Sequence, residues 1–382
     1  MSIVGTHLFV LQTSHFKLAI DDACSCIIMI KLVYRLFRAV LFPRQMLPTS
    51  KLLLLLFIHF IGGILIGYFI ANNRVMYKTN FVLTPSSIES RGALQHTHNS
   101  TSHVVIVNFS KPVNVTFKCM KTKTLLNYFN SHICVYDSQK DIYVSNSFRE
   151  STSIWEEEGV TRILRVLLRY PHLDFIDIGA NIGTYTMYAA ALGRFVLSIE
   201  CFGPNVDRLH RAVQLADVGN RIALVHNALY TKSGEYLKLS NDALNVGGQE
   251  LDAAMKPNIS KSLSHNQSLS NPYVVKTIQF DDLLPVLRER GLRSAIMKVD
   301  IEGSESFVVE AGSQIFDSFD IPMVQIEWLK VRVFPKRVNI LIDFFIKRNY
   351  EPRTFQCQLL AMNEVEKWPN DFCWTKKNFT FC

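Results

Sequence analysis

The chain carries a glycine-rich motif that begins with an acidic residue: Asp177-Ile-Gly179-Ala-Asn181-Ile-Gly183. The short apolar and β-branched run before it is typical of a buried parallel strand, and an alanine-rich segment typical of a helix follows it. Glycine has no Cβ, so Gly179 and Gly183 let the backbone approach a ligand closely. The motif therefore predicts a ligand-binding turn between a strand and a helix.

An acidic residue, Glu200, ends the next apolar run, at residues 195–200. A carboxylate about 20 residues past such a turn accepts hydrogen bonds from the ribose hydroxyls of a nucleoside. The turn is not the dinucleotide fingerprint G-x-G-x-x-G, because Asn181 stands where the second glycine would be, and Asp177 would repel a phosphate. The pattern favours a nucleoside with a cationic amino-acid tail. The alternative is a strand–turn–helix that binds nothing.

From residue 154 to residue 347, segments with strand and helix patterns alternate. This alternation predicts an α/β fold with a doubly wound, mainly parallel sheet of the Rossmann-like kind, whose ligands bind beyond the carboxyl ends of the strands. Residues 241–272 are polar and predict an exposed insertion. The predicted strand ends carry mostly carboxylates, and the side chains there are Asp177, Glu200, His226 with Asn227, Asp300 with Glu302, and Glu327.

A second motif, Lys298-Val-Asp300-Ile-Glu302-Gly-Ser-Glu305, follows one of these strands. Together with D-I-G-A-N-I-G-T-Y and the later I-E-W, it resembles the FkbM family of class I S-adenosylmethionine-dependent methyltransferases over residues 172–330. Many members of that family methylate hydroxyl groups of sugars. One departure is that Cys201 and Phe202 stand after the acidic residue, where the family usually has a proline.

The resemblance implies S-adenosylmethionine as the cofactor and a role for each motif residue. The turn with Asp177, Gly179, Asn181 and Gly183 would hold the methionine portion, and Glu200 would hold the ribose. The remaining implied cofactor contacts are with the adenine, by stacking of Phe202 and by proximity of Asn227.

Methyl transfer to a hydroxyl requires a general base, because the attacking oxygen must lose its proton. By resemblance, Asp300 and Glu302 face the methyl group and are the candidates for base and acceptor binding, with Glu327 as a third. A divalent cation held by Asp300 and Glu302 is an alternative. Lys298 either has a role in the site or only pairs with a neighbouring carboxylate, and both alternatives stay open, whereas His226 is predicted to be structural.

Residues 52–70 contain no Asp, Glu, Lys or Arg, and an apolar run of this length spans a bilayer as a helix. Basic residues are concentrated before it, which places the N-terminus in the cytosol. We therefore expect a cytosolic tail (1–51), a signal-anchor helix (52–70), a lumenal stem (71–112) and a methyltransferase domain (113–382). Met46 offers a second translation start. The net charge of +8 includes this basic flank, and no basic stripe with interleaved aromatic residues indicates nucleic-acid binding.

Glycosylation sequons occur only beyond the predicted anchor, at Asn99, Asn108, Asn114, Asn258, Asn266 and Asn378. In an oxidising lumen, cysteines on that side would form disulfides. Proximity favours a pair between Cys119 and Cys134 and another among the three C-terminal cysteines, with Cys201 free.

These features together predict a single-pass type II Golgi membrane protein that O-methylates glycans or glycoproteins. The substrate part of this prediction is an analogy with the usual design of secretory-pathway glycan enzymes. Two alternatives remain at this stage. In the first, the chain is a membrane-tethered, non-catalytic binding or trafficking module with a methyltransferase fold. In the second, it methylates a small molecule or a lipid.

Overall fold

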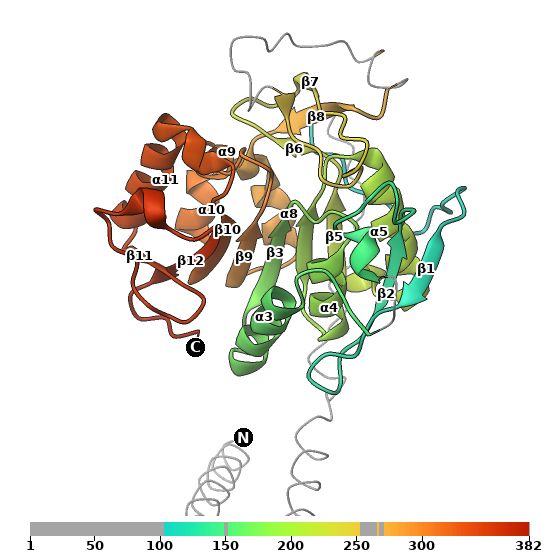
Figure 1. Ribbon diagram of the computed structural model, residues 1–382, viewed down its shortest axis with the longest axis horizontal. Coiled ribbons are helices and arrows are strands. Elements are labelled where there is room, and N and C mark those ends of the chain that lie inside the picture. The colour runs from blue at the N-terminus through green and yellow to red at the C-terminus, as the bar shows by residue number, and fades with distance from the viewer. Residues whose placement is uncertain (1–102, 149–151, 253–265, 267–270, 382) are drawn as a thin grey trace, which may run out of the picture. The chain divides into compact units, whose positions relative to one another are not determined.

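A computed structural model describes residues 103–148, 152–252, 266 and 271–381 of the chain (Figure 1). The predicted anchor, residues 52–70, lies outside this part, as do the predicted cytosolic tail and most of the predicted stem. Among the residues that the structure describes, no helix has the length and apolarity needed to cross a membrane.

A seven-stranded sheet forms the centre of the described domain, in the order β11-β12-β10-β9-β3-β4-β5 (Figure 1). The five strands from β10 to β5 are mutually parallel, whereas β12 runs antiparallel to both of its neighbours. The mainly parallel α/β sheet is therefore confirmed. The strands are β3 (Asp174–Ile178), β4 (Val196–Ile199), β5 (Ile222–Val225), β9 (Ala295–Val299), β10 (Met323–Glu327), β11 (Tyr350–Arg353) and β12 (Asp371–Lys376).

Helices cover both faces of this sheet, because its central strands are apolar on both sides. Phe175 of β3 packs into one hydrophobic cluster with side chains of α3, α4 and α5. Its neighbour Ile176 packs into the other cluster, with side chains of α8, α10 and α11. The helices are α3 (Glu157–Arg169), α4 (Thr184–Ala191), α5 (Gly203–Ala216), α8 (Leu284–Glu289), α9 (Ser306–Glu310), α10 (Ser313–Ser318) and α11 (Pro335–Lys347).

Smaller elements surround the sheet. A three-stranded sheet in the order β6-β8-β7 follows β5 in the chain. Single 3-10 turns join several of the larger elements. These elements are β6 (Ala228–Leu229), β7 (Tyr236–Lys238), β8 (Val274–Ile278), η2 (Ser145–Phe148), η3 (Gly219–Arg221), η4 (Phe280–Leu283), η5 (Val331–Val333) and η6 (Val365–Lys367).

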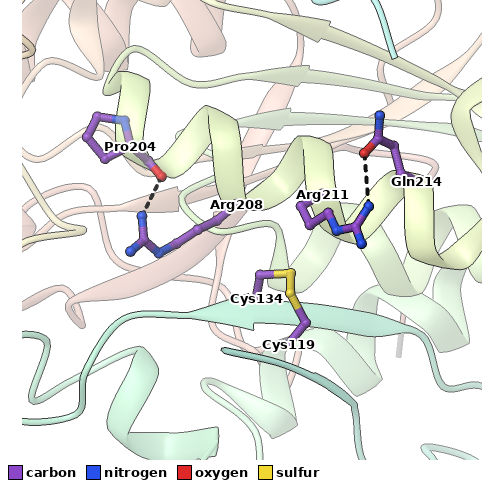
Figure 2. The surroundings of a disulfide bond; sticks show 6 residues. All are labelled: Cys119, Cys134, Pro204, Arg208, Arg211 and Gln214. Atoms are coloured by element: carbon purple, nitrogen blue, oxygen red, sulfur yellow. Dashed lines mark hydrogen bonds between the residues drawn. A yellow bond between two sulfur atoms is a disulfide. The ribbon is translucent and has the colours of Figure 1, made fainter. Parts of the chain in front are cut away.

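A disulfide joins the hairpin formed by β1 (Lys118–Lys121) and β2 (His132–Val135). Cys119 and Cys134 are paired in register and form this bond, as predicted. Figure 2 shows the disulfide beside α5, near Arg208 and Arg211. Cys201 is free, also as predicted.

The first described residues pack against the edge of the central sheet. Residues 103–107, which the sequence places in the stem, run beside β5, where Val107 N–H donates to the Leu224 carbonyl at 2.9 Å. Near the C-terminus, Cys357 is disulfide-bonded, whereas Cys373 is free and buried in β12. The sequence did not predict β11 or β12.

Candidate active site

A cavity of about 90 Å³ lies at the carboxyl ends of β3, β4 and β9. Six of the residues selected from the sequence line it, namely Gly179, Asn181, Glu200, Asn227, Asp300 and Glu302. The other four are described by the structure but are not among the lining residues: Asp177, Gly183, Phe202 and Glu327.

The glycine turn after β3 is shaped by positive φ angles at Gly179 (81°), Asn181 (51°) and Gly183 (98°). A Cβ on Gly179 would lie 1.8 Å from the Asp300 carbonyl oxygen, and one on Gly183 would lie 2.3 Å from the Leu209 side chain. The chain therefore requires glycine at 179 to pack against its own backbone, whereas at 183 the flexible Leu209 side chain could move and the positive φ is the stronger reason for glycine.

Glu200 links this turn to the start of α5. Its Oε2 accepts the Asn181 N–H at 2.8 Å, and its Oε1 accepts the Phe202 N–H at 2.8 Å. Burial raises the pKa of Glu200 to about 7, against the opposing effect of these hydrogen bonds. Each carboxylate oxygen has a second lone pair, so Glu200 retains the capacity to accept a ligand hydroxyl.

Three side chains that the resemblance implies as cofactor contacts are bonded to or packed against other groups of the protein. They are Asp177, Phe202 and Asn227. Asp177 lies behind the turn, where it accepts the Thr186 hydroxyl at 2.6 Å, and burial raises its pKa. Phe202 is 2% exposed and packs against the ring of Tyr273, so it is not presented for stacking on an adenine. These two side chains support the site from outside the cavity.

The amide of Asn227 is also fully engaged, although the residue lines the cavity. Its Oδ1 accepts the Val105 N–H at 2.7 Å, and its Nδ2 donates to the carbonyls of His103 and Lys276 at 3.3 and 3.2 Å. In this state Asn227 holds neighbouring segments together, so it can offer an adenine only van der Waals contact. Next to it, burial lowers the pKa of the His226 imidazole. The backbone N–H of His226 donates to the Val105 carbonyl.

Lys298 and Asp300 form an ion pair at the end of β9, with 2.8 Å between Nζ and Oδ2. Lys298 is 5% exposed. Burial disfavours its charged form, but the nearby carboxylates of Asp300, Glu156 and Asp177 outweigh burial and raise its pKa. Lys298 therefore has the carboxylate partner that one of the two sequence alternatives expected.

Glu302 follows in a left-handed conformation, with φ of 58°. Its Oε2 lies 2.7 Å from Lys330 Nζ, and Lys330 also contacts Glu250. Burial and, next, the charge of Asp300 raise the pKa of Glu302. Glu305 holds this turn by accepting the N–H groups of Ile301 and Gly303 at 3.0 and 3.1 Å.

No group of three or more His, Cys, Asp or Glu side chains among the described residues is arranged to hold a metal ion. The pair Asp300 and Glu302 therefore lacks a third protein ligand in the described part of the chain. Each of the two carboxylates is instead paired with a lysine.

Glu327, the third candidate base, ends β10 opposite Asp371 of β12. Burial, followed by the charges of Asp300 and Glu302, raises the pKa of Glu327 to about 10. Glu327 is also not among the residues that line the cavity. The structure therefore does not favour Glu327 as the general base.

Sequence reasoning missed Trp155 and Glu156, which precede α3 and line the cavity. Glu156 Oε2 accepts the hydroxyl of Tyr185, a motif residue, at 2.8 Å. The three consecutive glutamates at 156–158 look like ordinary helix-start charges, and nothing in the local sequence marks the first as different.

Part of the predicted exposed insertion also lines the cavity. Gln249 is 9% exposed and Leu251 is 5% exposed, so this portion is not an exposed loop. The Gly247 carbonyl accepts the side-chain amides of Asn205 and Asn181 at 2.8 and 3.3 Å. These bonds hold residues 247–251 against the glycine turn. The polar composition of this segment predicted exposure, but its polar groups can be buried because they form hydrogen bonds with one another.

The buried carboxyls predict a pH-dependent stability. Burial is the main cause of a raised pKa at Glu200 (about 7), Glu305 (about 8) and Glu327 (about 10), from an ordinary value of 4.5. The folded state therefore binds these protons more tightly than the unfolded state. The free energy of unfolding should fall as pH rises above about 5 and through the folded-state values.

We expect an unfolding midpoint about 5 °C lower near pH 9 than near pH 6, measured by calorimetry. Glu327→Gln keeps a neutral polar group and should reduce this difference. The matched control is Glu366→Gln, in the exposed turn η6. A midpoint that rises between these pH values would contradict the prediction.

Acidic groups predominate in the cavity lining. Glu156, Glu200, Asp300 and Glu302 face a single cationic side chain, Lys298, among the described lining residues. Such a site favours a positively charged ligand and disfavours a phosphate.

Residues 177–352 match the family model described as the methyltransferase FkbM domain. The matched range contains both motifs from which the resemblance was recognised. The match supports a methyltransferase that uses S-adenosylmethionine. No curated protein matches the chain.

Several solved methyltransferase structures are similar to the chain. An O-methyltransferase from Bacillus cereus, in complex with SAH, is 11% identical and has a TM-score of 0.30, over 59% of this chain and 83% of that one. A precorrin-6y C5,15-methyltransferase from Geobacter metallireducens is 11% identical with a TM-score of 0.31, over 62% of this chain and 100% of that one.

Proposed function

We propose that the chain is an S-adenosylmethionine-dependent O-methyltransferase that acts on sugar hydroxyls of glycans. The observation that supports this most is the meeting, at one acidic cavity, of the glycine turn, the buried Glu200 and the acidic turn after β9. The cavity suits a ligand with a sulfonium charge and a ribose. The Gly179–Asn181 turn would hold its methionine portion, and Glu200 its ribose.

Bound in this way, S-adenosylmethionine supplies a methyl group on a positively charged sulfur. The chain's own contribution is to bind the two reactants, to orient them and to take up the hydroxyl proton. Asp300 and Glu302 lie on the wall formed by β9, and their lysine partners fix their positions.

The cavity must enlarge to take such a ligand, because ligand pockets commonly have volumes of about 300–1,000 Å³. Residues 247–251 form a part of its wall that lies outside the central sheet. Their hydrogen bonds to Asn181 and Asn205 would have to change.

The glycan substrate and the Golgi location are proposals that rest on the predicted anchor and the sequons. Four sequon asparagines fall among the described residues, and all four are exposed: Asn108, Asn114, Asn266 and Asn378. The disulfide between Cys119 and Cys134 is also consistent with an oxidising compartment.

Turnover tests the proposal directly. The full chain, purified in detergent, is incubated with methyl-labelled S-adenosylmethionine and the methyl glycosides of mannose, galactose, fucose and N-acetylglucosamine. Labelled sugar supports an O-methyltransferase. Cofactor binding without transfer to any acceptor would favour the non-catalytic binding module, and transfer only to extracted lipid would favour a lipid methyltransferase.

We expect the protein made in cells to carry N-linked glycans, so glycosidase treatment should increase its gel mobility. Asn108→Gln should remove one glycan and produce a smaller shift. Asn349→Gln, outside any sequon, serves as the control for this substitution. Unchanged mobility, together with proteolysis of the C-terminal part from the cytosolic side, would contradict the proposed topology.

A further inference from the structure

Trp155 and Glu156 form a wall of the cavity that lies outside the family match at residues 177–352. Glu156 has a φ of 50°, a left-handed conformation that is unfavourable for a residue with a side chain. Such strain, of the order of 1–3 kcal/mol, persists only where the surrounding structure enforces it, and it is concentrated at functional sites. The strained backbone makes Glu156 a candidate functional residue, and its hydrogen-bond partners indicate which function.

The carboxylates at this end of the cavity differ in their partners. Asp300 and Glu302 are each paired with a lysine ammonium, at 2.8 and 2.7 Å. A neighbouring cation stabilises the ionised carboxylate and so weakens it as a base. Glu156 instead accepts a hydrogen bond from the neutral hydroxyl of Tyr185. Of these three carboxylates, Glu156 is the one that forms no ion pair with a lysine of the described residues, although Lys298 is near enough to lower its pKa.

Tyr185 fixes the position of Glu156. Tyr185 is 5% exposed, and its hydroxyl lies 3.4 Å from the side-chain nitrogen of Gln325, which donates to it from β10. Gly159 leaves room for this arrangement, because a Cβ there would lie 2.2 Å from the Tyr185 hydroxyl oxygen. The carboxylate is thus oriented by groups from α3, α4 and β10.

Trp155 is the only one of the chain's four tryptophans that lines this cavity. The other three are at most 2% exposed and pack together beside β10 and β12. An indole at the edge of a site offers a flat apolar face with a polar N–H, which suits the apolar face and hydroxyl rim of a sugar ring.

We propose that Glu156 is the general base of the methyl transfer and that Trp155 is the platform on which the acceptor sugar binds. This inference deepens the proposed function and rests on it. The acceptor hydroxyl oxygen forms a bond to the methyl carbon, and the carbon–sulfur bond breaks with its electron pair remaining on sulfur. The hydroxyl proton passes to the Glu156 carboxylate.

The groups around Glu156 determine in which direction turnover should change with pH. Burial raises its pKa, Lys298 lowers it, Asp300 and Asp177 raise it, and the hydrogen bond from Tyr185 lowers it. Asp371 of β12 also interacts with Glu156. Because the base must be deprotonated, turnover should rise with pH through this pKa. Tyr185→Phe removes one bond that lowers the pKa, so the rise should move to higher pH.

The decisive comparison is Glu156→Gln against Glu157→Gln, assayed with the same methyl glycosides. Glu157 is the neighbouring glutamate, paired with Lys123, and it is not among the cavity-lining residues. Glu156→Gln should reduce turnover by about 10²–10⁴-fold, and Glu157→Gln should leave it unchanged. Binding of S-adenosylhomocysteine and the unfolding midpoint should be similar in both variants. Asp300→Asn should reduce turnover less than Glu156→Gln.

The role of Trp155 is tested separately, by the KM for the glycosides and by tryptophan fluorescence. Trp155→Ala should raise KM for the glycosides more than it lowers kcat, and Trp155→Phe should restore most of the lost affinity. Binding of the glycosides should quench tryptophan fluorescence in the wild type but not in Trp155→Phe, whose remaining tryptophans are buried.

The outcomes separate this inference from the proposed function. Wild-type turnover in Glu156→Gln, or an unshifted pH profile in Tyr185→Phe, would overturn Glu156 as the base while leaving the enzyme intact. Unchanged KM in Trp155→Ala would overturn the platform. No labelled sugar with the wild type, despite cofactor binding, would contradict the proposed function and the inference with it.

Discussion

Glu200→Ala is expected to weaken the binding of S-adenosylmethionine by roughly 10- to 150-fold, measured by calorimetry. A hydrogen bond to a charged group contributes about 1.5–3 kcal/mol, which corresponds to that range. Glu200 also accepts the N–H groups of Asn181 and Phe202, so the variant loses the shape of the turn as well as the proposed ribose contact. Both losses act in the same direction.

Two further variants isolate the effect. Asp207→Ala removes an exposed acidic residue of α5 and should leave affinity unchanged. Glu200→Gln keeps one oxygen acceptor and should fall between the alanine variant and the wild type. Wild-type affinity in Glu200→Ala, with a normal unfolding midpoint, would contradict the assignment of the cofactor site.

Gly179→Ala should destabilise the domain by at least about 4 kcal/mol, or prevent folding altogether. The added Cβ would lie 1.8 Å from a backbone oxygen, that of Asp300, which cannot move without shifting the turn after β9. The positive φ of 81° adds a separate cost. Denaturant unfolding of the purified variant measures the loss.

Gly193→Ala separates the free-energy cost of the positive φ from that of the steric clash. Gly193 has a similar φ of 92°, but no atom lies within 4 Å of the position that its Cβ would occupy. Its substitution should therefore cost only about 1–2 kcal/mol, the price of the left-handed backbone. Equal losses in the two variants would show that the close approach to Asp300 is not what requires glycine at 179.

The motif around Asp177 could be recognised because its chemistry and its structure are both local. A strand, a tight turn and a helix follow one another within a few residues, and the strand end fixes the place of the cavity. The alternation of patterns likewise predicts the five parallel strands β3, β4, β5, β9 and β10. For some residues the sequence predicted the wrong role. Gly179 was expected to make room for a ligand, but it makes room for the Asp300 carbonyl. Phe202 was expected to stack on an adenine, but it belongs to the core.

Glu156 and β12 were missed because their roles depend on distant segments. Glu156 reaches the cavity through a left-handed backbone conformation that no sequence pattern announces, and it is held by Tyr185. The segment of β12 was viewed as a cysteine-containing end, whereas its place in the sheet is set by β10 and β11 on either side. Local periodicity carries no information on such pairing.

The position of β12 has a consequence for the order in which the sheet can be assembled. β12 lies between β10 and β11, yet it follows both of them in the chain. During synthesis β10 therefore presents an unpaired edge while residues 328–370 are added, and β11 has no neighbour in the sheet until β12 arrives. Pairing of this kind is non-local and slow, and exposed strand edges are prone to aggregation. A nascent chain of this protein should depend on chaperones at that stage, more than its parallel strands alone would require.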